Sequence, residues 1–146
     1  MFLLDTDYAI LLQRGRGPEL HRLLERMSAY PDTVFHYPVI TFHEQMLGAN
    51  AYIARAKSPR ESVRGYAILQ QVLEDYSRAQ VLSFDDDAAQ IFQGMRKQRV
   101  RVGTMDLRIA SIALSRDFTV LTRNLVDFRQ IPSLKVEDWT TVKDEN

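Results

Sequence analysis

Short apolar runs alternate along the chain with longer stretches in which apolar residues recur every three or four positions. The short runs predict five β-strands, over residues 2–4, 34–40, 80–84, 118–121 and 134–136. The longer stretches predict helices that begin near residues 8, 18, 41, 59, 85 and 104, and residues 122–129 predict a turn or a single helical turn. Pro38 indicates that the second strand lies at an edge or ends there. Strands that alternate with helices favour an α/β fold with a mostly parallel sheet.

Several helix starts are marked by residues that suit helix caps. Thr41 and Glu44 have the spacing of a capping box, in which the two side chains satisfy free backbone N–H groups. Ser58 and Glu61 repeat that spacing at the start of the next helix. Thr104 is the predicted N-cap of the helix that follows it.

Length and composition predict one globular domain over residues 1–146, with flexibility confined to the polar last few residues. The chain has no cysteine, which excludes disulfide frameworks and thiolate chemistry. The longest apolar run is Tyr8 to Leu12, whereas a membrane helix needs about 20 residues. The N-terminus lacks the basic and apolar regions of a signal peptide. We therefore expect a cytoplasmic protein with no membrane association.

Charge is balanced overall but clustered locally. There are 19 basic and 19 acidic residues, which excludes a histone-like protein that binds nucleic acid by net charge alone. Basic side chains nevertheless gather at Arg96, Lys97, Arg99 and Arg101, with Arg108 further on. The cluster is typical of a solvated helix face, and it would equally serve as a set of phosphate contacts.

Acidic residues follow several of the predicted strands. Asp5 ends the first strand, Glu44 and Asp106 lie in the first turns of helices, and Asp127 follows the fourth strand. Each could simply favour a helix start or a turn. In an open parallel sheet, however, the active crevice lies beyond the carboxyl ends of the strands, where these carboxylates would converge. Such a cluster needs a hard cation, and Mg²⁺ or Mn²⁺ would suit its oxygen ligands.

Four segments that contain these acids resemble the motifs of PIN-domain nucleases, and of VapC-like toxins in particular. They occur in the family's order and cover nearly the whole chain. The segments are residues 2–7 (FLLDTD), 40–44 (ITFHE), 103–110 (GTMDLRIA) and 121–128 (LTRNLVDF).

The resemblance implies a three-layer α/β/α fold with a central five-stranded sheet and an activity that cleaves RNA with water activated by Mg²⁺ or Mn²⁺. It also implies a homodimer and an antitoxin protein that blocks the site. By position, Asp5, Glu44, Asp106 and Asp127 would surround the metal. The polar residues that order them would be Thr6, beside Asp5 or a metal-bound water, and Asn124, near Asp127. The expected substrate rim comprises Arg96, Lys97, Arg99, Arg101, Arg108 and Arg123.

Two residues depart from the family pattern, and two other interpretations remain. Asp7 stands where many relatives have asparagine, and Tyr8 is bulky in a stretch that is usually small or aliphatic, where it could alter the fit of the substrate. A PIN domain could act as a binding module without catalysis. A strand that ends in Asp5-Thr6-Asp7 also resembles the start of haloacid-dehalogenase-like phosphatases, in which Asp5 would be the nucleophile and Asp7 the acid/base. That chemistry needs a lysine and an acidic pair later in the chain, where few residues remain.

Overall fold

A five-stranded sheet forms the centre of the computed structural model, which describes residues 1–142. Every recorded strand pairing is parallel, and the strand order is β3-β2-β1-β4-β5. The strands are β1 (Phe2–Leu4), β2 (Phe35–Pro38), β3 (Val81–Leu82), β4 (Thr119–Leu121) and β5 (Val136–Glu137). The predicted α/β architecture with a five-stranded parallel sheet is therefore confirmed.

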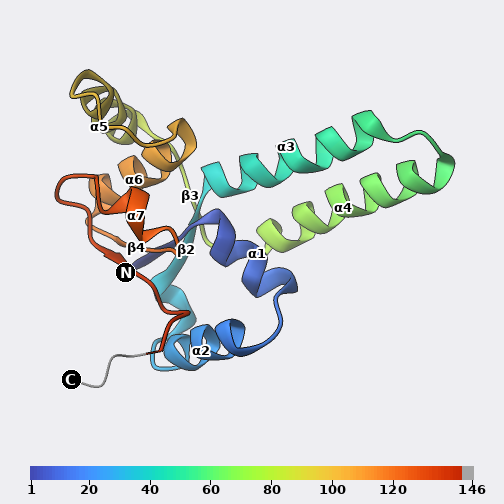
Figure 1. The fold of residues 1–146 in the computed structure, drawn as a ribbon, viewed down its shortest axis with the longest axis horizontal. Coiled ribbons are helices and arrows are strands. Elements are labelled where there is room, and N and C mark those ends of the chain that lie inside the picture. The colour runs from blue at the N-terminus through green and yellow to red at the C-terminus, as the bar shows by residue number, and fades with distance from the viewer. Residues whose placement is uncertain (143–146) are drawn as a thin grey trace.

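Helices connect the strands and cover both faces of the sheet (Figure 1). They are α1 (Thr6–Arg14), α2 (Pro18–Met27), α3 (Val39–Arg55), α4 (Pro59–Ser77), α5 (Asp86–Lys97), α6 (Thr104–Arg116) and α7 (Leu125–Phe128), with a 3-10 turn η1 (Asp32–Val34) before β2.

Neighbouring side chains of the central strands enter different cores. Leu3 and Val120 pack with residues of α5 and α6, whereas Leu4 and Leu121 pack with α1, α2 and Trp139. Successive side chains of a strand point to opposite faces, so each of these strands supplies one residue to each core. Two cores on the two faces of one sheet make the predicted three-layer α/β/α arrangement.

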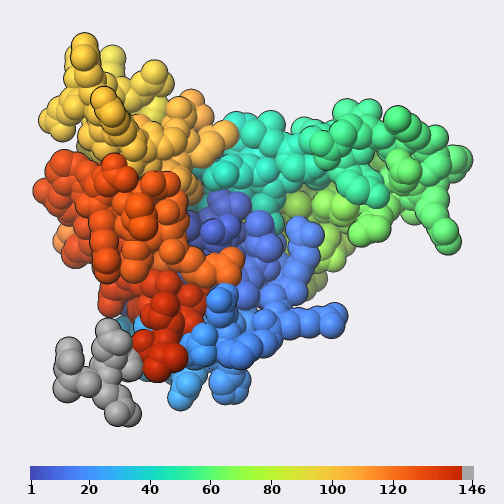
Figure 2. Space-filling view, viewed as in Figure 1, coloured from blue at the N-terminus to red at the C-terminus, as the bar shows by residue number. Residues whose placement is uncertain are grey.

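Helices α3 and α4 form an antiparallel hairpin that projects from the body of the molecule (Figures 1 and 2). Ser58 caps α4 by accepting a hydrogen bond from the Glu61 backbone N–H, and Pro59 occupies the first helical position, as the sequence predicts. This hairpin exposes apolar side chains, including Leu47 in the middle of α3 and Val63 and Tyr66 in α4.

Three predicted element boundaries are wrong. The second strand ends at Pro38 and α3 begins directly at Val39, so Thr41 lies buried inside the first helical turn instead of capping it. A helix can begin there because Pro38 holds an extended conformation that suits an N-cap. Helix α6 has Gly103 as its N-cap, and Thr104 is its first helical residue.

None of the helices among residues 1–142 is both long and apolar enough to cross a membrane. The predicted flexibility of the last few residues concerns residues 143–146, which lie outside the described part of the chain.

Candidate active site

The strand order places Asp5 at the point between β1 and β4 where the order of the parallel strands reverses. β1 is central, with β2 on one side and β4 on the other. The chain leads from β1 to β2 on the first side and from β4 to β5 on the second. In parallel sheets, ligands bind beyond the carboxyl ends of the strands at such a reversal. Asp5 follows β1 directly, and Thr122 follows β4 directly, so the two residues meet across the reversal.

Two contacts to its carboxylate and one to its backbone hold Asp5 in place. Asp5 is the N-cap of α1, and its Oδ1 accepts a hydrogen bond from the Tyr8 backbone N–H at 3.0 Å. Its Oδ2 accepts a short hydrogen bond from the Thr122 hydroxyl. The Asp5 backbone N–H donates to the Leu121 carbonyl at 3.2 Å, which extends the pairing of β1 with β4. The side chain is only 5% exposed, so its orientation is set by the fold.

Burial makes the ionised form of Asp5 costly. Desolvation raises the pKa of Asp5 to about 7, against the opposing effect of the hydrogen bonds from Thr122 and Tyr8. The nearby charges of Asp7 and Asp106 raise the pKa further. A buried carboxyl group whose pKa is raised by desolvation and by neighbouring acids is typical of a functional site.

The pKa of Asp106 shows that the other acidic residues lie close to it. It lies in the first turn of α6 and is half-buried. Desolvation, followed by the charges of Glu44, Asp127 and Asp7, raises its pKa to about 6. Because such charge effects fall off over a few ångströms, the structure brings together five carboxylates from four separate segments of the sequence.

The polar neighbours of Glu44 differ from the prediction. Thr6 was expected beside Asp5, but its hydroxyl donates a hydrogen bond to Glu44 Oε1 at 2.8 Å. The reason is local, because Asp5 as N-cap turns back toward the Tyr8 N–H while Thr6, the first residue of α1, faces α3. Thr6 Oγ1 also lies 3.5 Å from Thr41 Oγ1, so the buried Thr41 forms part of the same polar group.

Asn124 holds Asp127 within the short helix α7. The Asn124 side-chain amide donates to Asp127 Oδ2 at 2.9 Å, and its Oδ1 accepts from the Asp127 backbone N–H at 3.4 Å. Thr122 joins this segment to Asp5, because its Oγ1 accepts a hydrogen bond from the Asn124 backbone N–H at 2.9 Å while its hydroxyl proton goes to Asp5.

The sequence interpretation missed Thr122 as a site residue. A polar residue directly after a strand that neighbours β1 was the available signal, but the neighbouring strand could be identified only from the strand order. Asp7, which had been noted for its charge, is exposed in the first turn of α1 and raises the pKa of both Asp5 and Asp106.

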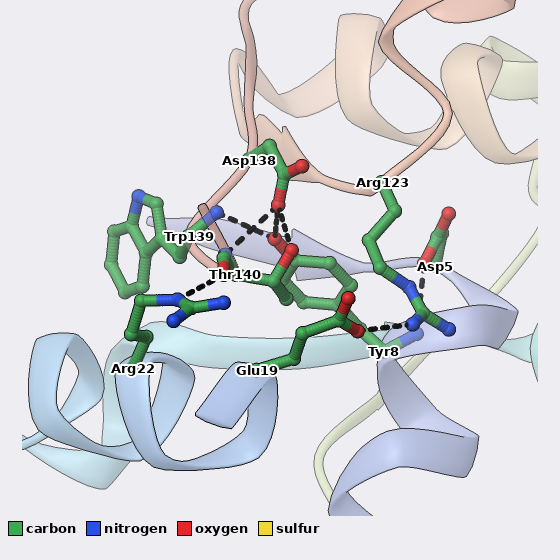
Figure 3. A network of polar contacts seen from close by, with 8 residues as sticks. All are labelled: Asp5, Tyr8, Glu19, Arg22, Arg123, Asp138, Trp139 and Thr140. Atoms are coloured by element: carbon green, nitrogen blue, oxygen red, sulfur yellow. Dashed lines mark hydrogen bonds and ion pairs between the residues drawn. The ribbon is translucent and has the colours of Figure 1, made fainter. Parts of the chain in front are cut away.

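Tyr8 does not line the carboxylate group. Its ring is fully buried and points from α1 toward the C-terminal segment (Figure 3). Its hydroxyl donates to Asp138 Oδ1 at 2.7 Å and accepts from the Trp139 backbone N–H at 2.6 Å. Tyr8 therefore fastens the C-terminal segment to the core, and the expectation that its bulk alters substrate fit is not supported by its position.

The residues of the predicted basic rim lie in two separate regions of the structure. Arg123, next to Thr122, forms an ion pair of 2.7 Å with Glu19 at the start of α2 (Figure 3). Arg96 and Arg108 both lie over the ring of Phe92 on the side of α5 and α6. The remaining members are exposed near the end of α5 and in the loop that follows it: Lys97, Arg99 and Arg101.

The donor set suits a hard divalent cation. In residues 1–142, no three Asp, Glu, His or Cys side chains already have the mutual geometry of a metal site. Mg²⁺ keeps several waters and often binds through one or two carboxylates plus substrate phosphates, so it does not require a complete protein cage. The crowded oxygen ligands, two of which have raised pKa values, fit such an ion, and a cation would relieve their repulsion.

Comparison with known proteins identifies the family. The family model described as "PIN domain" matches residues 2–134. The chain is a PIN-domain protein. It is 40% identical over 138 residues to "Ribonuclease VapC" of Rickettsia bellii, which covers 92% of both chains. It is 36% identical over 143 residues to "tRNA(fMet)-specific endonuclease VapC" of Shigella flexneri, which covers 95% of this chain and 98% of the relative. These matches place it in the VapC ribonuclease branch of the PIN-domain family.

Solved structures agree with this assignment. The fold is similar to that of a VapBC complex from nontypeable Haemophilus influenzae, with a TM-score of 0.72, 24% identity and coverage of 96% and 98% of the two chains. It is also similar to a DNA-bound VapBC from Salmonella typhimurium, with a TM-score of 0.66, 27% identity and coverage of 94% and 97%. The predicted PIN-like fold and VapC-type ribonuclease family are confirmed, in preference to the haloacid-dehalogenase-like alternative.

Proposed function

We propose that this PIN-domain protein is a metal-dependent endoribonuclease in which Asp5, Glu44, Asp106 and Asp127 form the catalytic metal site. The observation that carries the proposal is the crowding of these carboxylates where the strand order reverses, since burial and then mutual charge raise the pKa of Asp5 and Asp106. The family supports the reaction class, and the crowding of the four carboxylates supports the choice of residues.

Mg²⁺ or Mn²⁺ bound at this group would activate water and stabilise the charge that develops on a phosphodiester as it is displaced. The chain's own polar residues keep the ligands in place. Thr122 and the Tyr8 N–H orient Asp5, Thr6 holds Glu44, and Asn124 holds Asp127. Partners of this kind fix the orientation of metal ligands, so their loss lowers metal affinity or activity.

The proposed substrate is RNA, with initiator tRNA as the first candidate. Two relatives, from Salmonella typhimurium and Shigella flexneri, carry the name "tRNA(fMet)-specific endonuclease VapC". The relative from Salmonella typhimurium is 31% identical over 142 residues, which covers 94% of this chain and 97% of the relative. Such similarity supports testing tRNA before other RNAs.

A partner protein is part of the proposal. The two similar solved structures above are described as VapBC, and another, from Klebsiella pneumoniae, is described as a toxin-antitoxin complex. We propose that this chain forms a homodimer, that a cognate antitoxin blocks the carboxylate site, and that the protein acts on RNA in the cytoplasm.

The direct test is cleavage of purified initiator tRNA by the full chain in Mg²⁺ or Mn²⁺. Asp5→Asn removes a ligand charge without changing shape, so cleavage should fall at least about 100-fold while circular dichroism is unchanged. EDTA should have the same effect. A matched control is Asp86→Asn, an exposed acid in the first turn of α5 that should leave cleavage intact.

Two outcomes would contradict the proposal. Full activity in Asp5→Asn or in EDTA would exclude the metal-nuclease mechanism. Tight RNA binding by the wild-type chain, without cleavage of any RNA offered, would instead support the binding-module alternative.

A further inference from the structure

We propose that Arg96 and Arg108, stacked on Phe92, form a backbone-binding clamp that guides an RNA strand to the carboxylate site. This inference rests on the proposed function, because it assigns the substrate contacts of the same site. The clamp lies on α5 and α6, whereas the polar side chains that orient the carboxylates lie on other segments: Thr6, Thr122 and Asn124.

The clamp is built around a single aromatic ring. The guanidinium carbon of Arg96 lies 5.7 Å from the centroid of Phe92, and that of Arg108 lies 5.5 Å from it. The negative face of an aromatic ring attracts cations and restricts their movement. Phe92 is itself held by an edge-on contact with Phe84 at 6.1 Å, so the two arginines rest on a fixed surface.

Neither guanidinium of the clamp is neutralised within the protein. Among residues 1–142, the recorded ion pairs involve Arg116, Arg123 and Lys135 only. Two like charges next to one ring repel each other unless an anion lies between or beside them. Guanidinium groups offer paired N–H donors that match phosphate oxygens, so phosphate is the anion that best suits the clamp.

The clamp adjoins the carboxylate site because α5 and α6 run antiparallel. Arg116 at the end of α6 pairs with Asp85, the N-cap of α5, at 3.3 Å. The last turn of α5, with Arg96, must therefore lie beside the first turns of α6, which carry Asp106 and Arg108. Figure 2 shows this yellow-to-orange part of the surface next to the teal start of α3, which carries Glu44.

The position of the two arginines also reduces the electrostatic repulsion between the carboxylate site and RNA. A group of carboxylates repels the phosphates of an approaching RNA strand, and cations at its edge offset that repulsion. Arg123 is paired with Glu19, whereas neither Arg96 nor Arg108 has a recorded ion pair within residues 1–142, so the clamp is the better available phosphate contact. Phosphate contacts of this type position a strand without reading its sequence.

Binding should be measured in an Asp5→Asn background, so that RNA is not cut, with fluorescent initiator tRNA and a short single-stranded RNA as probes. Arg96→Gln and Arg108→Gln should each raise Kd roughly fivefold near 0.1 M salt. Each should also flatten the slope of log K against log salt by about 0.7. Arg→Lys at the same positions should restore the slope, because lysine keeps the charge. Unaltered circular dichroism and thermal melts would show that the variants fold.

The matched control is Arg78→Gln, since Arg78 is exposed and lies before the amino end of β3, whereas the carboxylate site lies beyond the carboxyl ends of the strands. It should leave Kd and the salt slope unchanged. If wild-type protein cleaves RNA but both clamp variants bind like the parent, the clamp is refuted and the proposed function stands. If the wild-type chain neither binds nor cleaves RNA, both are overturned. A loss in Arg78→Gln equal to that in the clamp variants would reduce the effect to net charge and also refute the clamp.

Discussion

Asp106→Asn should stabilise the metal-free protein at neutral pH. Asp106 occupies the first turn of α6, where the helix dipole alone would favour an acid. Burial and the charges of Glu44, Asp127 and Asp7 act in the opposite direction and raise the pKa of Asp106 to about 6. Asparagine keeps the shape of the side chain and removes the charge that the other carboxylates repel.

The magnitude follows from the pKa. A rise from 3.8 to about 6 corresponds to roughly 3 kcal/mol of penalty when the group is fully ionised. Because the side chain is only half-buried, solvent screening reduces this to about 1–2 kcal/mol. Asparagine also loses the favourable interaction of the carboxylate with the helix dipole, which lowers stability by about 0.3–1 kcal/mol. The net gain is therefore about 1 kcal/mol, or roughly 2–4 °C in Tm.

The stabilisation expected from Asp106→Asn depends on pH. A carboxyl group whose pKa is raised in the folded state bears no penalty below its unfolded pKa near 4, where both states are protonated. The penalty grows as pH rises toward 6 and is complete above it. Thermal melts of wild type and Asp106→Asn in EDTA should thus differ at pH 7.5 and coincide near pH 4.

The matched control is Asp86→Asn, which removes an acid from the first turn of α5, outside the carboxylate group. It should be neutral or destabilise the protein by about 0.3–1 kcal/mol. Mn²⁺ should raise the Tm of wild type more than that of Asp106→Asn, because only the folded state assembles the ligands. A lower Tm for Asp106→Asn at pH 7.5, with no response of wild type to Mn²⁺, would refute the reasoning.

Three further variants test other parts of the account. Arg99 has a φ of 56°, one residue beyond the C-cap of α5, where glycine is favoured, so Arg99→Gly should raise stability by about 1 kcal/mol in a denaturant melt; a loss would contradict this. Tyr8→Phe leaves the buried Trp139 backbone N–H without its acceptor and removes one of the donors to Asp138, so it should cost about 1–3 kcal/mol while the cleavage rate per folded molecule is unchanged; lost cleavage at full folding would place Tyr8 in the site. Thr122→Val removes a hydrogen bond that lowers the pKa of Asp5, so the acid limb of the cleavage-pH profile should move to higher pH; an unmoved limb would show that Thr122 does not control this ionisation.

The sequence allowed the elements and the acidic residues to be predicted, because both depend on local patterns. Asp5 directly follows an apolar run, and Asp106 lies in the first turn of a helix whose start the sequence marks at Thr104. The strand order was not available from periodicity, since hydrophobic spacing describes one strand or helix at a time. For that reason Thr122, which meets Asp5 only because β4 pairs with β1, could not be recognised.

The errors concern side-chain direction. Thr41 and Glu44 have capping-box spacing, yet Pro38 begins the helix earlier and turns both residues toward α1 instead. Tyr8 lies in a motif that faces the site, but it is three residues beyond Asp5 on α1. Its ring enters the core that contains Leu4 and Trp139 and so points away from the carboxylates. A sequence motif thus identifies which residues occur together, while the contacts of each side chain depend on the packed elements around it.

The central claim is that carboxylates from four segments form one metal site. Calorimetric titration of Mn²⁺ into the full chain, and into single variants of the four acids, tests it most directly. The account predicts that wild type binds Mn²⁺ and that each variant binds at least roughly tenfold more weakly: Asp5→Asn, Glu44→Gln, Asp106→Asn and Asp127→Asn. Binding that is unchanged in all four variants would contradict the claim.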